Sequence, residues 1–120
     1  MARFRLSRPA QADIGKILST SAERWGIDAR RRYAALLSAA FRKLAANPEG
    51  PATRDRAELQ SGIRSLHIRF ANAGEPVAKV RNPVHILYYR QAAPGLIEIV
   101  RVLHERSDPG RHLDEKPDLL

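Results

Sequence analysis

The sequence contains no cysteine, and this absence removes several kinds of site at once. Disulfide bridges, thiolate zinc sites and a cysteine nucleophile all need that residue, and a small fold without disulfides suits a reducing compartment. The sequence also lacks a run of about 18 apolar residues, and its N-terminus lacks the pattern of a signal peptide. We therefore expect a cytoplasmic protein that does not enter a membrane.

Recognisable metal and cofactor motifs are missing as well. The histidines at positions 67, 85, 104 and 112 have neither HxxxH nor HExxH spacing, and no acidic cluster accompanies them. The sequence has no Gly-rich phosphate loop, no paired-carboxylate signature and no Ser-His-Asp order. We expect neither a metal ion nor a cofactor.

The composition is that of one globular domain. The chain has 120 residues, of which 43% are hydrophobic and 28% charged. Domains commonly have about 100 to 150 residues, so we expect a single domain over residues 1–113, followed by a mobile tail at 114–120.

Positive charge is the strongest compositional signal. The 21 Lys and Arg residues exceed the 13 Asp and Glu residues, which gives a formal net charge of +8. Such an excess favours association with acidic proteins or with phosphate backbones. The plainer interpretation is that the charge serves solubility alone.

The first half of the chain predicts a short strand and two helices. Residues 3–6 alternate basic and apolar residues and indicate the strand. Ser7 can cap a helix in which Pro9 fits the first turn and Gly26 ends the run. Its apolar residues lie on one face, which predicts that Trp25 packs against the sheet at the end of the core; they are Ala10, Ile14, Ile17, Leu18, Ala22 and Trp25.

A second helix is expected from a cap at Asp28 to about Ala46, where Asn47 and Pro48 stop it. Its apolar positions again share one face; they are Tyr33, Leu36, Leu37, Ala40, Phe41 and Leu44. Arginines at positions 30–32 oppose the helix dipole in the first turns. We interpret them as a solvated face that Asp28 partly compensates.

The second half predicts strands. Residues 63–70 alternate, with Leu66, Ile68 and Phe70 on the core face, after a loop at 47–62. Two β-rich runs, 84–90 and 96–108, flank the Pro94-Gly95 turn and predict an antiparallel hairpin. Residues 77–81 fit either a strand extension or a protruding flap.

These elements predict an α+β fold in which a helical hairpin packs on a mostly antiparallel sheet of about four strands, in the order β-α-α-β-β-β. The run from 96 to 103 is nearly continuous in apolar residues, so we expect it to be central and covered on both faces. Beyond it, Arg101, His104 and Arg106 are candidates for presenting positive charge to a target.

Several short stretches together resemble the ParE branch of the ParE/RelE toxins of bacterial type II toxin–antitoxin systems. They are LSRPA at 6–10, AERWG at 22–26, LAANP at 44–48, GIRS at 62–65 and VRVLHERSD at 100–108. The resemblance implies a RelE/ParE-like fold and a toxin that blocks DNA gyrase with its DNA cleaved. It also implies a ParD-like antitoxin that neutralises the toxin, and a toxin–antitoxin complex that binds operator DNA through the antitoxin.

On this interpretation the protein is a binding module and not an enzyme. We expect the antitoxin to contact the helical hairpin at Leu18, Tyr33, Leu37 and Phe41. A second possibility is a partner in operon repression that is not itself toxic.

A third possibility is a RelE-like ribosome-dependent mRNA interferase. Its acid–base and phosphate-binding groups would come from five residues, Tyr88, Arg90, Arg101, His104 and Arg106. The plainer interpretation of Tyr88 and Tyr89 is a pair of core rings with hydroxyl groups at the edge.

Overall fold

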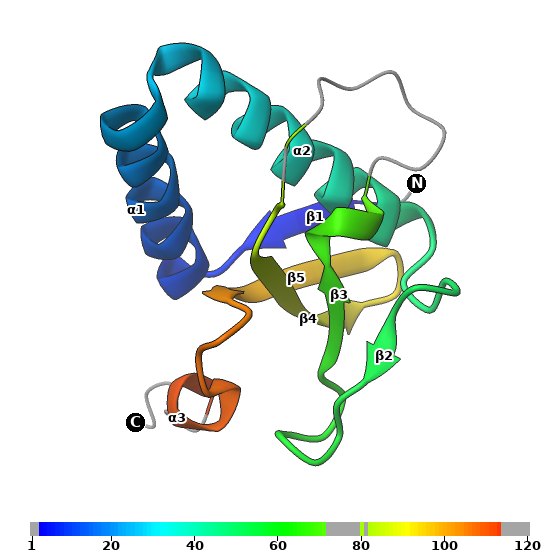
Figure 1. The fold of residues 1–120 in the computed structure, drawn as a ribbon. Helices are drawn as coiled ribbons and strands as arrows, with labels where there is room; N and C mark the ends of the chain where they lie inside the picture. Colours follow the sequence, from blue (N-terminus) through cyan, green and yellow to red (C-terminus); the bar gives the residue numbers. More distant parts are fainter. Residues whose placement is uncertain (1–2, 72–79, 81, 114–120) are drawn as a thin grey trace.

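The computed structural model describes residues 3–71, 80 and 82–113. Figure 1 shows the helices α1 (Arg8–Trp25), α2 (Ile27–Ala46) and α3 (Pro109–Leu113), and η1 (Ile68–Phe70) is a 3-10 turn. The strands are β1 (Arg3–Leu6), β2 (Arg54–Asp55), β3 (Arg64–His67), β4 (His85–Ala93) and β5 (Leu96–His104). The expectations about residues 77–81 and the tail at 114–120 concern segments that lie wholly or mostly outside the described residues.

The strands form one sheet in the order β1-β5-β4-β3-β2. Strands β2 to β5 pair antiparallel with their neighbours, whereas β1 runs parallel to β5. This confirms the expected α+β class and the mostly antiparallel sheet. The sheet has five strands instead of about four, because Arg54 and Asp55, expected in a loop, pair with Ser65 and Arg64.

The two long helices begin and end at local signals in the sequence. The Ser7 hydroxyl accepts a hydrogen bond from the Ala10 amide at 3.1 Å and caps α1, as expected. Gly26, with φ of 95°, ends α1 and also occupies the N-cap of α2. The cap expected at Asp28 is therefore wrong by two positions, and Asp28 lies instead in the first turn of α2.

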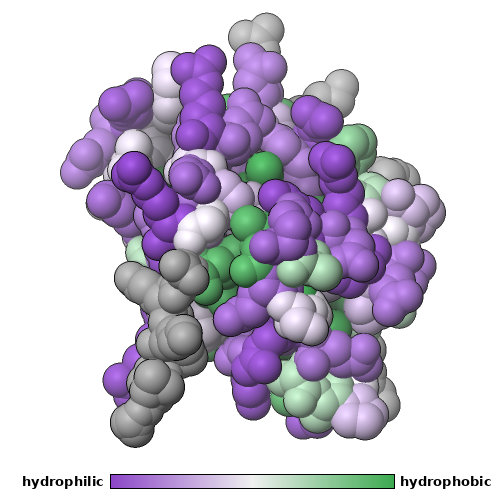
Figure 2. All heavy atoms as spheres, turned by 90° about the horizontal axis from the view of Figure 1, so that it is seen from below, coloured by the Kyte–Doolittle hydropathy of each residue, from purple (hydrophilic) through white to green (hydrophobic). Residues whose placement is uncertain are grey.

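The helices α1 and α2 cover one face of the sheet (Figure 1) and bury the main core against it. The opposite face has a smaller cluster of Ile63, Tyr88, Leu103 and Leu113, so α3 contributes there. Strand β5 supplies residues to both clusters, which confirms that it is covered on both faces. From below, most of the surface is hydrophilic and hydrophobic residues show in small areas (Figure 2).

Two packing expectations are wrong. Trp25 is 74% exposed, because the end of α1 lies away from the sheet, as Figure 1 shows for the α1–α2 junction. Phe70 is 40% exposed, because the chain leaves the strand after His67 and enters η1. The 3-10 turn ends the two-residue alternation on which the expectation for Phe70 depended.

Candidate functional site

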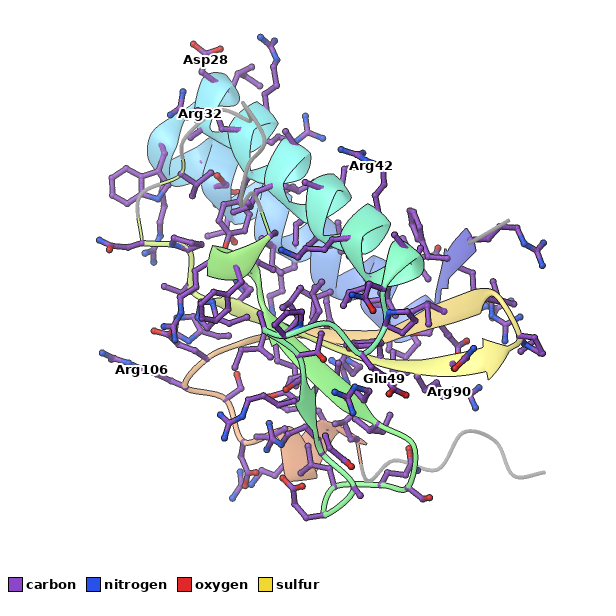
Figure 3. The ribbon with its side chains drawn as sticks, turned by 90° about the vertical axis from the view of Figure 1, so that its right-hand side faces the viewer. Asp28, Arg32, Arg42, Glu49, Arg90 and Arg106 are labelled. Atoms are coloured by element: carbon purple, nitrogen blue, oxygen red, sulfur yellow. The ribbon has the colours of Figure 1, made fainter. Side chains whose placement is uncertain are left out.

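The loop that follows β5 presents two of the three residues expected to meet a target. His104 and Arg106 are exposed, and Figure 3 shows Arg106 pointing away from the body of the protein. The backbone holds this loop in place, since Glu105 N–H donates to the Val84 carbonyl at 2.7 Å and Ser107 N–H donates to the His104 carbonyl at 2.9 Å. The loop is therefore an ordered surface.

Arg101, the third expected target residue, has a structural role. Its guanidinium donates two hydrogen bonds of 2.8 Å to the Asp13 carboxylate, which also accepts from the Val102 amide at 2.9 Å. Both side chains are largely buried, with 15% and 13% of their area exposed. The pair fastens α1 to the part of β5 that extends beyond β1. This corrects the expectation that Arg101 offers its charge to a partner.

A chain of polar rings lies beside this loop, and no pattern in the sequence predicted it. The Tyr33 hydroxyl accepts from the Val84 amide at 3.3 Å and forms a second hydrogen bond of 2.6 Å with His85 Nδ1. The His85 ring in turn lies 5.7 Å from the His104 ring. Burial lowers the pKa of His85 to about 4 and raises the pKa of Tyr33 to about 12. Both groups are therefore uncharged at neutral pH.

The other two histidines of this region also form hydrogen bonds, each with a nearby backbone amide. Nδ1 of His67 accepts from the Arg69 amide and Nδ1 of His104 accepts from the Arg106 amide. An accepting Nδ1 places the proton on Nε2, so His67 donates from Nε2 to Glu105 at 2.7 Å. This hydrogen bond is the main cause that lowers the pKa of Glu105. The loop thus presents the Arg106 cation beside a His104 ring that is hydrogen-bonded to the backbone.

The five residues considered for RNA cleavage do not form one site. Tyr88 is 2% exposed, and the Arg56 guanidinium lies 5.8 Å from its ring centre. Arg90 forms a 2.8 Å ion pair with Glu98. In Figure 3, Arg90 and Arg106 lie on opposite sides of the view. With Arg101 held by Asp13, only His104 and Arg106 of the set remain together on the surface.

The residues expected to bind an antitoxin belong mainly to the core. Leu37 is 2% exposed and Phe41 6%, which leaves them almost no surface for a partner and corrects that expectation. Leu18 and Tyr33 are half-buried. Periodicity shows that α2 has an apolar stripe but does not show what covers it. In the structure this stripe faces the sheet, so only its margins reach the surface.

A shallow hollow of about 410 Å³ lies between β1 and the end of α2. Its walls are Arg3, Phe4, Arg42, Ala45 and Ala46. Phe4 is 37% exposed and its ring lies 5.3 Å from that of Phe41. The hollow is therefore lined by one aromatic ring and two arginines.

Within the described residues, no group of three His, Asp or Glu side chains could hold a metal ion. In the same part of the chain, no helix is long and apolar enough to cross a membrane. Neither observation adds a site to the surfaces described above.

Comparison with known proteins assigns the family. Residues 4–109 match the family model described as the ParE toxin of type II toxin-antitoxin system, parDE. This chain belongs to the ParE toxin family. It is 36% identical over 111 residues to "Toxin ParE1" of Mycobacterium tuberculosis, which covers 92% of this chain and 97% of the relative. It is 33% identical over 113 residues to "Toxin ParE1" of Caulobacter vibrioides, with 94% and 99% covered.

A solved structure supports the same fold. The "Chromosomal ParDE TA system" from P. aeruginosa superposes with a TM-score of 0.63, covering 87% of this chain and 95% of that one at 16% identity. The protein is thus the toxin component of a ParDE type II toxin–antitoxin system, and such a system implies an antitoxin partner.

Proposed function

We propose that this ParE-family toxin inhibits DNA gyrase, trapping the enzyme with its DNA cleaved, and that a ParD-like antitoxin neutralises it. The observation that carries the proposal is the dispersal of the five candidate RNA-cleaving residues. A nuclease needs its acid–base groups within reach of one phosphate, whereas Tyr88 is buried and Arg90 is paired with Glu98. A binding toxin needs only an accessible charged surface, and the loop with Arg106 provides one.

A second surface, formed by the edge of β1 and the hollow beside it, is suited to binding the antitoxin. Among the described residues, β1 has a neighbouring strand on one side only. An unpaired edge can accept a strand from a partner, and an adjacent aromatic hollow can accept an apolar side chain. The cations Arg3 and Arg42 beside Phe4 suit an acidic segment. We propose that the antitoxin docks here, reaches the half-buried Leu18 and Tyr33, and carries the complex to operator DNA.

The test compares two kinds of damage in cells that express the toxin from an inducible promoter. We expect gyrase-dependent DNA breaks, DNA-damage signalling and filamentous cells, with mRNA intact. A strain in which gyrase is depleted serves as the control, because breaks that depend on gyrase should not form in it. Rapid mRNA cleavage on ribosomes without DNA breaks would contradict the proposal and would favour an mRNA interferase. Normal growth of the expressing cells would instead favour a non-toxic partner in operon repression.

A further inference from the structure

The junction of α1 and α2 carries two exposed apolar side chains among arginines. Trp25 is 74% exposed and Ile27 59%, and they flank Gly26 directly. We define the hairpin tip as residues 24–32. It contains four arginines and one acid, Asp28; the arginines are Arg24, Arg30, Arg31 and Arg32, and all four are exposed.

Backbone hydrogen bonds fix the turn at the centre of the hairpin tip. Gly26 N–H donates to the Ala22 carbonyl at 3.0 Å and closes α1, while the Gly26 carbonyl accepts from Arg30 N–H at 3.2 Å and opens α2. One residue thus joins the two helices, and no loop separates Trp25 from Ile27. A backbone that is already fixed loses little conformational entropy on binding, so this arrangement is preorganised for contact.

Folding does not account for the composition of the hairpin tip. Large apolar side chains gain stability by burial, which Trp25 does not achieve. Cations in the first turns of α2 oppose the helix dipole. Asp28 offsets them little, because its ion pair with Arg31 is 3.7 Å long and both side chains are about four-fifths exposed to solvent (80% and 77%).

The combination has the composition of a protein-binding hot spot. Tryptophan and arginine are the residue types most enriched at such sites, where an aromatic anchor fills a pocket and polar groups form the rim. A second copy of the chain is a poor occupant, because two cationic tips repel each other. A nucleic acid would match the arginines but would leave Trp25 and Ile27 facing phosphates.

The shape of the hairpin tip indicates whether it binds a target or an antitoxin. Antitoxin segments of the kind proposed above are helices or strands, and these dock in grooves or along sheet edges. The hairpin tip is the convex end of two helices (Figure 1) and fits a concave pocket on a folded protein.

We infer that the hairpin tip inserts Trp25 and Ile27 into an apolar pocket with an acidic rim on the toxin's folded target enzyme. This inference rests on the proposed function, in which the toxin acts by binding an enzyme. Trp25 is the anchor, Ile27 completes the apolar contact, and the arginines speed association and fix orientation.

The test uses the double variant Trp25→Ala/Ile27→Ala in the full chain. Since both side chains are exposed, we expect an unchanged melting temperature and antitoxin affinity within about twofold of wild type. We expect loss of toxicity in cells and at least ~30-fold weaker binding to purified gyrase, the loss typical of a truncated hot-spot residue. The matched control is Phe70→Ala, which removes an aromatic ring that is 40% exposed elsewhere and should stay toxic.

The toxicity assay in cells tests the role of the hairpin tip, whatever the identity of the target. A folded double variant that remains fully toxic overturns the inference and leaves the proposed function standing. A double variant that stays toxic but escapes the antitoxin assigns the tip to the antitoxin and also overturns it. Wild-type toxin that kills cells without binding gyrase contradicts the proposed function instead, and loss of killing by the double variant then still supports the tip.

Discussion

The Asp13–Arg101 pair offers the sharpest test of how the fold is held together. Changing Asp13 to alanine removes the acceptor of two guanidinium hydrogen bonds and of the Val102 amide hydrogen bond. It leaves the Arg101 cation largely buried, since only 15% of its side chain is exposed.

The size of the effect follows from burial. Removing one partner of a buried ion pair typically costs about 3 to 5 kcal/mol, because the other charge is left without compensation. Some solvent reaches this pair, so we expect about 3 kcal/mol for Asp13→Ala. For a domain of this size each kcal/mol lowers the melting temperature by roughly 4 °C, so the loss should be about 12 °C.

Urea denaturation of four proteins measures this directly: wild type, Asp13→Ala, Arg101→Ala and the double variant. We expect the double variant to be less destabilised than the sum of the two single changes, by about 1 to 2 kcal/mol. Arg111→Ala is the matched control, because its pair with Asp108 is 4.0 Å long and well exposed. It should cost less than about 0.5 kcal/mol. Strict additivity, or equal effects of Asp13→Ala and Arg111→Ala, would refute the reasoning.

Three further predictions concern pH, the helix junction and the loop after β5. Because burial lowers the pKa of His85 from 6.5 to about 4, the unfolded chain takes up a proton in that interval before the folded chain does, so stability should decline as pH falls from 6.5 to 4. After allowance for solvent the decline should be about 1 to 2 kcal/mol, and chemical denaturation of His85→Gln should show a flatter profile. Gly26→Ala should lower the unfolding free energy by about 1 kcal/mol, because φ is 95° there, and calorimetry that finds no change would count against this account of the junction. In growth assays Arg106→Glu should weaken toxicity while His104→Gln is tolerated, whereas a general acid or base at position 104 would show a loss of about 10² to 10⁴ in cleavage rate.

Local signals in the sequence were sufficient for most element boundaries. Ser7 and Pro9 start α1 where expected, Asn47 ends α2, and the Pro94-Gly95 turn joins β4 to β5. Each of these signals acts on a few neighbouring residues through a cap, a missing N–H or a permitted φ. The sequence could therefore reveal them without knowledge of the tertiary structure.

The contacts of the candidate site could not be predicted in this way, since their partners lie far apart in the chain. Arg101 meets Asp13 across 88 positions, and Tyr33 meets His85 across 52. Neither spacing is a motif. The charge of Arg101 suggested a free cation, and only the packing of α1 against β5 shows that it is engaged.

Periodicity also has a definite limit, which Trp25 illustrates. The 3.6-residue repeat correctly placed Ile14, Ile17 and Leu18 beside the core. It gives the face of a helix but not how far the sheet extends beneath it, and Trp25 lies past that end. The same limit hid the hairpin tip, whose apolar residues are exposed because they have no sheet to cover them.

The central claim is tested most directly by purified toxin, DNA gyrase, ATP and supercoiled plasmid in one reaction. The account predicts that cleaved plasmid accumulates with increasing toxin, only when gyrase is present, and that added antitoxin prevents it. Intact plasmid at toxin concentrations that arrest growth, together with mRNA cut on ribosomes by the same preparation, would contradict the account.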